Sequence, residues 1–213
     1  VKSGYYYGYH NAKVCGNQTK QNNSLSPTLN EGEMRIVLKW PKTNPVTVTD
    51  LDSHLSIPNK DDNGTVHLSR DTNVVVSGST CYQCDYYIYG ANDNATLDKD
   101  HKASSTPGSP PADETMTITK VRSETYRYSV YNYSDRTANT DAKTTNFSNS
   151  RAKVKAFYCP WGQPVPYCNI EGSVVRKRFN IPNDNGTLWG VFTFNKDTGF
   201  TASDNMTTAT ANP

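Results

Sequence analysis

Apolar and polar residues alternate with a period of two in many short stretches of this chain, and this pattern constrains its fold more than any other feature. In residues 34–40 (MRIVLKW), every second residue from Met34 to Trp40 is apolar, which is typical of a half-buried strand. No segment of ten or more residues has the period of a helix, and twelve prolines are spread along the chain. The sequence therefore predicts an all-β fold, an antiparallel β-sandwich of about eight strands with a jelly-roll or immunoglobulin-like topology.

Turn signals separate the expected strands, and the strongest are Asn63-Gly64 and Asn185-Gly186. Strands are expected at residues 34–40, 51–57, 65–68, 74–76, 86–89, 125–133, 153–158, 174–179 and 188–194, and at the two ends of 95–118. The polar segment 195–213 has room for one more strand. The chain divides into an N-terminal extension strand with a polar linker (1–33), a β-sandwich domain (34–206) and a C-terminal tail (207–213).

The charge of the chain gives no reason to expect a nucleic-acid partner. Its 22 basic residues are balanced by 20 acidic ones, and the one basic run, Arg176-Lys177-Arg178, is predicted to be part of a polar strand. No apolar run is long enough for a membrane-spanning helix. The sequence begins at Val1 without a signal-type apolar segment, which is consistent with a processed N-terminus.

Eight Asn-x-Ser/Thr sequons indicate a glycosylated extracellular or cell-surface protein that carries N-linked glycans. The sequons begin at Asn17, Asn22, Asn63, Asn94, Asn132, Asn146, Asn185 and Asn205. The turn residues Asn63 and Asn185 are the strongest candidates, whereas Asn132 shares a strand face with Val130 and is expected to point partly inward. The alternative is that asparagine-rich turns create sequons by chance.

The five cysteines are predicted to form disulfides rather than a metal or redox site. Cys159 and Cys168 bracket a proline-rich loop that a local bridge would close, and Cys15 is expected to pair with Cys81 or Cys84. The Cys81-x-x-Cys84 motif has no second pair for structural zinc and no βαβ pattern around it for thioredoxin-like chemistry. The odd count leaves one free thiol or one intermolecular bond.

Two Asp-x-Asp pairs are the best candidates for a metal site. Asp50 with Asp52, and Asp98 with Asp100, have the strand spacing that places both carboxylates of a pair on one face. Such oxygen ligands suit Ca²⁺, and Asp113 and Glu114 are further candidates. The alternative is that these carboxylates cap turns and pair with Arg127 or with lysines.

Catalysis has little support in the sequence, and we expect that the chain is not an enzyme. His54 has serine and aspartate neighbours, but no GxSxG motif is present, so we interpret it as a solvated strand histidine. Paired carboxylates also serve glycosidases, although no aromatic cleft can be located around them. Tyrosines are candidates for a sugar-stacking surface, namely Tyr5-Tyr6-Tyr7, Tyr86-Tyr87, and Tyr131 with Tyr133.

Four stretches resemble a β-sandwich domain of secreted, uncharacterised bacterial and microbial-eukaryotic surface proteins. The motifs are LKW followed by DLDSHL (38–55), LDKD leading to ETMTI (97–118), YRYSVYNYS (126–134) and WGVF (189–192). Their order covers about residues 34–206 and leaves the first 33 residues, the cysteines and two insertions outside. The resemblance implies a surface or adhesin module more than an enzyme.

The N-terminal extension suggests how such a module could assemble. Tyr5, Tyr7 and Tyr9 alternate with other residues, and the polar linker separates this strand from the sandwich. It could complete its own sheet or lie in the sheet of another copy. We therefore expect a structural subunit of an extracellular glycosylated fibre or surface layer, a homopolymer joined through this strand. The alternative is a carbohydrate-binding or adhesin module with glycans as partners.

Overall fold

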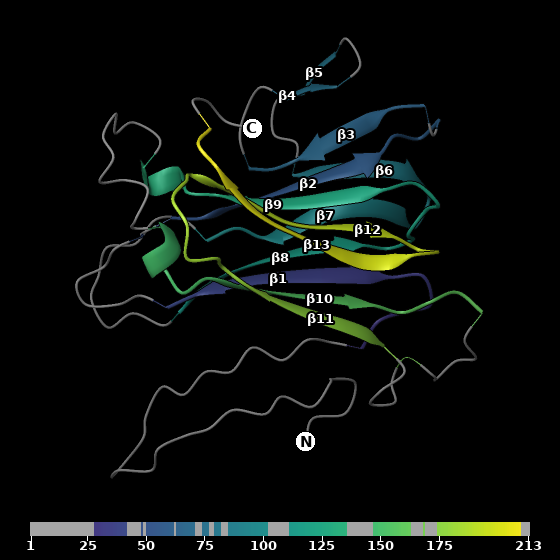
Figure 1. Cartoon of the computed structure of the whole chain (residues 1–213). Helices are drawn as coiled ribbons and strands as arrows, with labels where there is room; N and C mark the ends of the chain where they lie inside the picture. The colour runs from purple at the N-terminus through teal and green to yellow at the C-terminus, as the bar shows by residue number, and fades with distance from the viewer. Residues whose placement is uncertain are drawn as a thin grey trace, which may run out of the picture.

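The protein is an all-β sandwich, as the sequence predicts, in which two antiparallel sheets pack face to face (Figure 1). The computed structural model describes residues 28–41, 48, 50–61, 63–70, 74–76, 79–81, 85–101, 111–135, 147–162, 168 and 174–209. The predicted N-terminal strand and its tyrosines, Tyr5, Tyr7 and Tyr9, lie outside the described residues.

The first sheet has six strands in the order β11-β10-β1-β8-β7-β6. These strands are β1 (Met34–Trp40), β6 (Tyr86–Gly90), β7 (Asp93–Lys99), β8 (Ala112–Ile118), β10 (Lys153–Tyr158) and β11 (Val175–Asn180). The central strand β1 pairs with β10 on one side and with β8 on the other, so segments more than a hundred residues apart in the sequence become neighbours.

The second sheet has five strands in the order β13-β12-β9-β2-β3. These strands are β2 (Asp52–Pro58), β3 (Thr65–Leu68), β9 (Tyr126–Tyr131), β12 (Leu188–Asn195) and β13 (Gly199–Thr207). A small separate hairpin is formed by β4 (Val74–Val76) and β5 (Ser79–Cys81), and a 3₁₀ turn, η1 (Tyr133–Asp135), follows β9.

The core lies between the two sheets and is built from the inward residue of each alternating pair. In β1, Met34, Ile36, Leu38 and Trp40 are buried, while Arg35 and Lys39 are half-buried on the outer face. Trp40 from the first sheet and Trp189 from the second are both fully buried. Removing such large apolar side chains from water is the main force that holds the sheets together.

The structure has more strands than the roughly eight that the sequence predicts, and the further strand for which the C-terminal segment had room is one of them. The segment that we expected to be a polar tail with room for a strand contains β13, which pairs along β12 and extends one residue past the predicted domain end at 206. Most β13 side chains are exposed. An edge strand of this kind is held mainly by backbone hydrogen bonds. Its sequence therefore shows little of the alternating apolar pattern from which strands are predicted.

Candidate functional site

Three carboxyl groups meet between the two sheets. Asp52 begins β2, Asp100 follows the end of β7, and Glu114 lies in β8. One oxygen of each lies within 4.8 Å of an oxygen of the others, and we call these three residues the acidic cluster. Asp52 and Glu114 are buried, and Asp100 is half-buried.

Hydrogen bonds and one ion pair fix the carboxylates of the acidic cluster. The backbone N–H of Ser53 donates to Glu114 Oε2 at 2.8 Å, which links the two sheets, and the N–H of His101 donates to Glu114 Oε1 at 3.4 Å. Arg70 Nε lies 3.6 Å from Asp100 Oδ2 and partly balances its charge. The site is therefore held by residues from both sheets.

Burial raises the pKa of Glu114 well above its usual range, and the negative charge of Asp52 raises it further, although hydrogen bonds from Ser53 act in the opposite direction. Removing a carboxylate from water disfavours its charged form, and a like charge nearby adds to that effect. A protonated Glu114 can donate its proton to a neighbouring carboxylate oxygen. The raised pKa of Glu114 favours its protonated, neutral form within the acidic cluster.

A β-bulge explains why Asp100 belongs to the acidic cluster and Asp98 does not. The pairing of β7 with β8 shifts by one residue between Leu97 and Lys99, so Asp98 is the extra residue. An extra residue reverses the alternation that follows it. Asp100 therefore reaches Glu114 on the inner side, while Asp98 is exposed.

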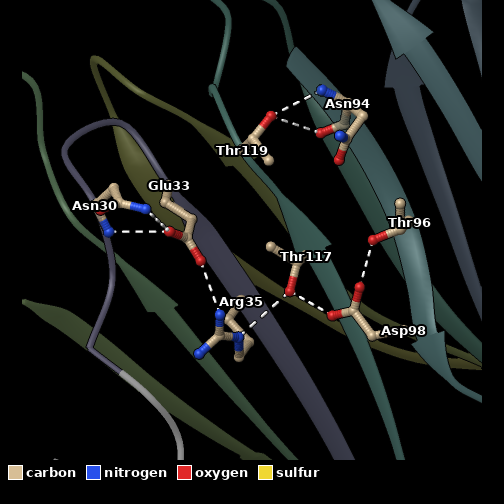
Figure 2. A network of polar contacts seen from close by, with 8 residues as sticks. All are labelled: Asn30, Glu33, Arg35, Asn94, Thr96, Asp98, Thr117 and Thr119. Atoms are coloured by element: carbon tan, nitrogen blue, oxygen red, sulfur yellow. Dashed lines mark hydrogen bonds and ion pairs between the residues drawn. The ribbon is translucent and has the colours of Figure 1, made fainter. Parts of the chain in front are cut away.

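Asp98 instead joins a polar network on the outer face of the six-stranded sheet, which Figure 2 shows. Its carboxylate accepts hydrogen bonds from the hydroxyl groups of Thr96 and Thr117. Thr117 also accepts a hydrogen bond from Arg35, whose guanidinium forms an ion pair with Glu33 at 2.8 Å. The prediction that both members of this Asp-x-Asp pair share one face is corrected here.

Asp50 also lies outside the acidic cluster. Its backbone N–H donates to Ser134 Oγ at 2.7 Å, and its carbonyl oxygen accepts hydrogen bonds from Ser134 Oγ and N. This arrangement ties the start of β2 to the 3₁₀ turn that follows β9. Of the four aspartates predicted for a metal site, the structure brings together Asp52 and Asp100, with Glu114 as the third member.

His54 is buried, and the prediction of a solvated strand histidine is wrong. Only 1% of its surface is exposed, and its Nδ1 lies 2.8 Å from Nε2 of His67 on the neighbouring strand β3. Burial, with a smaller contribution from the nearby His67, lowers the pKa of His54 to about 3. Ser53 Oγ hydrogen-bonds with the hydroxyl of Tyr128 at 2.8 Å, whereas His54 pairs with His67, so these contacts do not form a Ser-His pair.

Burial separates the predicted glycosylation sites into groups. Asn63, Asn185 and Asn205 are exposed, and Asn94 is half-buried. Asn132 is fully buried, so its side chain cannot carry a glycan in this fold, which corrects that part of the prediction. Asn17, Asn22 and Asn146 lie outside the described residues.

The structure contains the predicted bridge between Cys159 and Cys168. Their Cα atoms lie 5.9 Å apart, within the usual range for a disulfide. Both residues pack with Leu29 and Val174 in a small hydrophobic cluster beside the main core. The predicted pairing of Cys15 with Cys81 or Cys84 depends on residues whose placement or side chains the structure does not describe.

The tyrosines that are candidates for a sugar-stacking surface differ in their exposure to solvent. Tyr86 is 58% exposed on β6, whereas Tyr131 is buried and packs edge-on against His54, so it cannot offer a ring face to a sugar. Tyr87 is half-buried and packs edge-on against Tyr89. Among these candidate tyrosines, Tyr86 at the outer edge of the six-stranded sheet is the one that exposes most of its surface.

Within the part of the chain that the structure describes, the acidic cluster is a group of oxygen ligands that could hold a cation. Carboxylate oxygens are the ligands that Ca²⁺ takes, and backbone carbonyls or water would have to complete its six to eight positions. A bound cation would favour the ionised form of Glu114, so binding would release its proton.

Comparisons of the chain with protein-family models, curated proteins and solved structures find no match. Within the described residues, no helix has the length and apolar character needed to cross a membrane.

Proposed function

We propose that this protein is a structural subunit of an extracellular, glycosylated fibre or surface layer, and that copies join by adding a strand to a sheet edge. The proposal makes the chain a building unit rather than an enzyme. The observation that carries it is the character of β6, the last strand of the six-stranded sheet.

β6 is an edge strand that exposes large apolar side chains. Tyr86 is 58% exposed and Ile88 is 62% exposed, both on the same side of the strand, while Tyr89 is buried. β6 pairs with β7 on one side, and on its other side it has no strand partner within the described ranges. Its sequence, YYIYG, contains no charged residue and no proline.

The other three sheet edges carry features that discourage strand addition. β11 contains Arg176, Lys177 and Arg178, and β3 is only four residues long. β13 carries Asp204 in the left-handed region at φ 45°, which interrupts a regular strand. Charges, short length and local irregularity are common protections of sheet edges, and β6 has a single irregularity near Gly90. β6 is therefore the edge best suited to accept another strand.

The N-terminal segment of a neighbouring copy has the composition of a suitable partner. Residues 1–14 contain alternating tyrosines that could pack beside Tyr86 and Ile88 while the backbones pair. Residues 16–33, at up to about 3.3 Å per residue, can span tens of ångströms. Such a head-to-tail contact does not close on itself, so its repetition produces a filament.

Two variants test this proposal by sedimentation velocity and electron microscopy of the native protein. Deletion of residues 1–14 removes the donor, and Ile88→Lys places a charge on the acceptor edge. We expect both variants to be folded monomers, since neither change touches a buried side chain of the described sandwich. Thr201→Lys, an exposed residue of the edge strand β13, is the matched control and should still assemble.

Filaments that persist in both variants would contradict the proposal. Unfolding after the deletion would show that residues 1–14 complete their own sandwich. Loss of assembly in Thr201→Lys to the same extent as in Ile88→Lys would remove β6 as the acceptor.

A further inference from the structure

Positive charge is concentrated on three adjacent strands of the six-stranded sheet. β1, β10 and β11 lie side by side along one flank of the sandwich (Figure 1). Together they carry seven basic residues and no aspartate or glutamate, although the whole chain has a net charge of only +2. The basic residues are Arg35, Lys39, Lys153, Lys155, Arg176, Lys177 and Arg178.

The strand register places several of these charges directly opposite one another. Lys155 of β10 faces Arg178 of β11, and Lys39 of β1 faces Lys153 of β10. The alternation of buried residues in β10 directs Lys153 and Lys155 away from the core. We call Lys39, Lys153, Lys155 and Arg178 the basic face.

Holding these charges together costs stability, because like charges at directly opposed strand positions repel. Partial removal of the Lys155 ammonium group from water lowers its pKa, although the residue is exposed overall, and the charges of Arg178, Lys39 and Lys153 lower the pKa further. Among the described residues, no carboxylate forms an ion pair with Lys153, Lys155 or Arg178. Asp113, which lies opposite Lys39 on β8, forms an ion pair with Lys99, and its negative charge also partly compensates that of Lys39. A negatively charged partner would relieve this repulsion.

A cavity of about 270 Å³ extends the basic face at the end of β1 and β10. It is lined by Lys39, Trp40, Pro41, Pro111, Arg151 and Lys153, so cations and apolar side chains share its wall. Arg151 is exposed and adopts a left-handed backbone conformation at φ 56°. This conformation is uncommon for a residue with a side chain, and it is found more often where a residue has a functional position.

We propose that the basic face and its adjoining cavity bind a linear acidic polysaccharide. Carboxylate or sulfate groups of the polymer would contact the four cations, and the apolar side of a sugar ring would pack on Pro41 and Pro111. Cations along one strand recur about every 6.7 Å, and those on neighbouring strands lie about 4.8 Å apart, which suits anionic groups repeated along an extended chain. The inference does not depend on assembly through β6.

A nucleic acid fits the basic face less well. Single-stranded nucleic acids gain much of their affinity by stacking bases on exposed aromatic rings. Phe157, the aromatic residue on the outer side of β10, is half-buried, lies between Arg35 and Arg176 in the register, and packs on the small disulfide-containing cluster. It therefore offers little ring surface for stacking.

Binding of the full chain to immobilised polymers tests the proposal at low and at physiological salt. The probes are alginate for carboxylates, dextran sulfate for sulfates, neutral dextran, and a single-stranded oligothymidylate. The double variant Lys155→Gln with Arg178→Gln should bind the acidic polysaccharides about tenfold more weakly than the wild type. It should unfold at the same temperature as the wild type or a higher one, because the change relieves repulsion between two exposed side chains.

The matched control removes two exposed charges elsewhere, by Lys60→Gln with Lys120→Gln, and should keep wild-type affinity. Retention of the wild type by alginate or dextran sulfate, with loss only in the first variant, supports the proposal. An equal loss of affinity in both double variants would show that binding depends on net charge alone, and this would overturn the proposal. Absence of binding to both acidic polysaccharides would also overturn it, as would binding of oligothymidylate that is at least as tight as theirs.

Discussion

Replacing Glu114 by glutamine should change the way in which stability depends on pH. Glutamine has nearly the same shape as a protonated glutamic acid: its oxygen can accept the hydrogen bond from the Ser53 N–H, and its amide can donate to a carboxylate of the acidic cluster. The two side chains differ in that glutamine never ionises. Glutamine would lose, at every pH, the 3.4 Å hydrogen bond that Glu114 Oε1 accepts from the His101 N–H, so the pH dependence of the stability difference, rather than its absolute value, reports on the proton of Glu114.

The sign and size of the effect follow from burial. The pKa of Glu114 is higher in the folded state than in the unfolded state, so between these two values the native protein holds a proton that the unfolded chain has released. The free energy of unfolding then falls by about 1.4 kcal/mol per pH unit, starting near the unfolded pKa of about 4.3. The free energy of unfolding of the Gln variant does not fall in this way. The variant should therefore become increasingly more stable than the wild type as pH rises, until the folded-state pKa of Glu114 is reached.

The difference in free energy of unfolding between the wild type and the Gln variant can be measured by urea unfolding at several pH values. Tryptophan fluorescence reports the unfolding, and a calcium chelator is present throughout. His54 contributes a slope of opposite sign in part of this range, because its pKa is lowered in the folded state, but it does so in both proteins and cancels. Glu124→Gln, at an exposed position, is the control and should leave the slope unchanged.

A Gln variant that becomes less stable than the wild type as pH rises would refute this reasoning. That result would mean that Glu114 is ionised in the folded protein, because hydrogen bonds stabilise its carboxylate by more than its removal from water costs.

Further predictions concern the rest of the sandwich. If the acidic cluster binds calcium, a hundredfold excess of Ca²⁺ over its dissociation constant should stabilise the fold by about 2.7 kcal/mol, and an unchanged melting temperature between chelator and Ca²⁺ would exclude the site. The imidazole NMR signals of His54 should remain those of the neutral ring down to about pH 4, since its pKa is about 3, and a charged ring at pH 6 would contradict its burial. Replacing Cys159 and Cys168 by alanine should lower stability by about 2.7 kcal/mol from loop entropy, and non-reducing peptide mapping should identify the bridge in the wild type. Enzymatic deglycosylation of native protein should lower its intact mass, and glycopeptide analysis should find Asn132 unmodified; no mass loss would remove the glycoprotein prediction.

The sequence alone was sufficient to predict the class of fold. Period-two alternation, as in residues 34–40, determines which side chains a strand can bury, and the Asn-Gly pairs mark turns where the chain reverses. The short proline-rich segment between Cys159 and Cys168 made their bridge predictable, because the two residues are close in sequence. These features are local, and local patterns remain readable without knowledge of the partner strand.

Side-chain surroundings could not be predicted in this way. The alternation of β2 suggested a solvated side for His54, but the paired strand β3 and the packing around it bury that histidine. The bulge at Asp98 cannot be predicted from the spacing of Asp98 and Asp100. It places the carboxylate of Asp98 on the outer face of the sheet and that of Asp100 near Glu114.

The basic face is the clearest product of tertiary structure. Its cations come from segments around residues 39, 153–155 and 178, and along the sequence the first two of these groups do not form a basic run. Only the register of β1, β10 and β11 places them side by side, and the pairing of β1 with β10 joins residues that are more than a hundred positions apart in the sequence. The alternation in a sequence determines which residues face the core, but the pairing of strands decides which outward residues become neighbours.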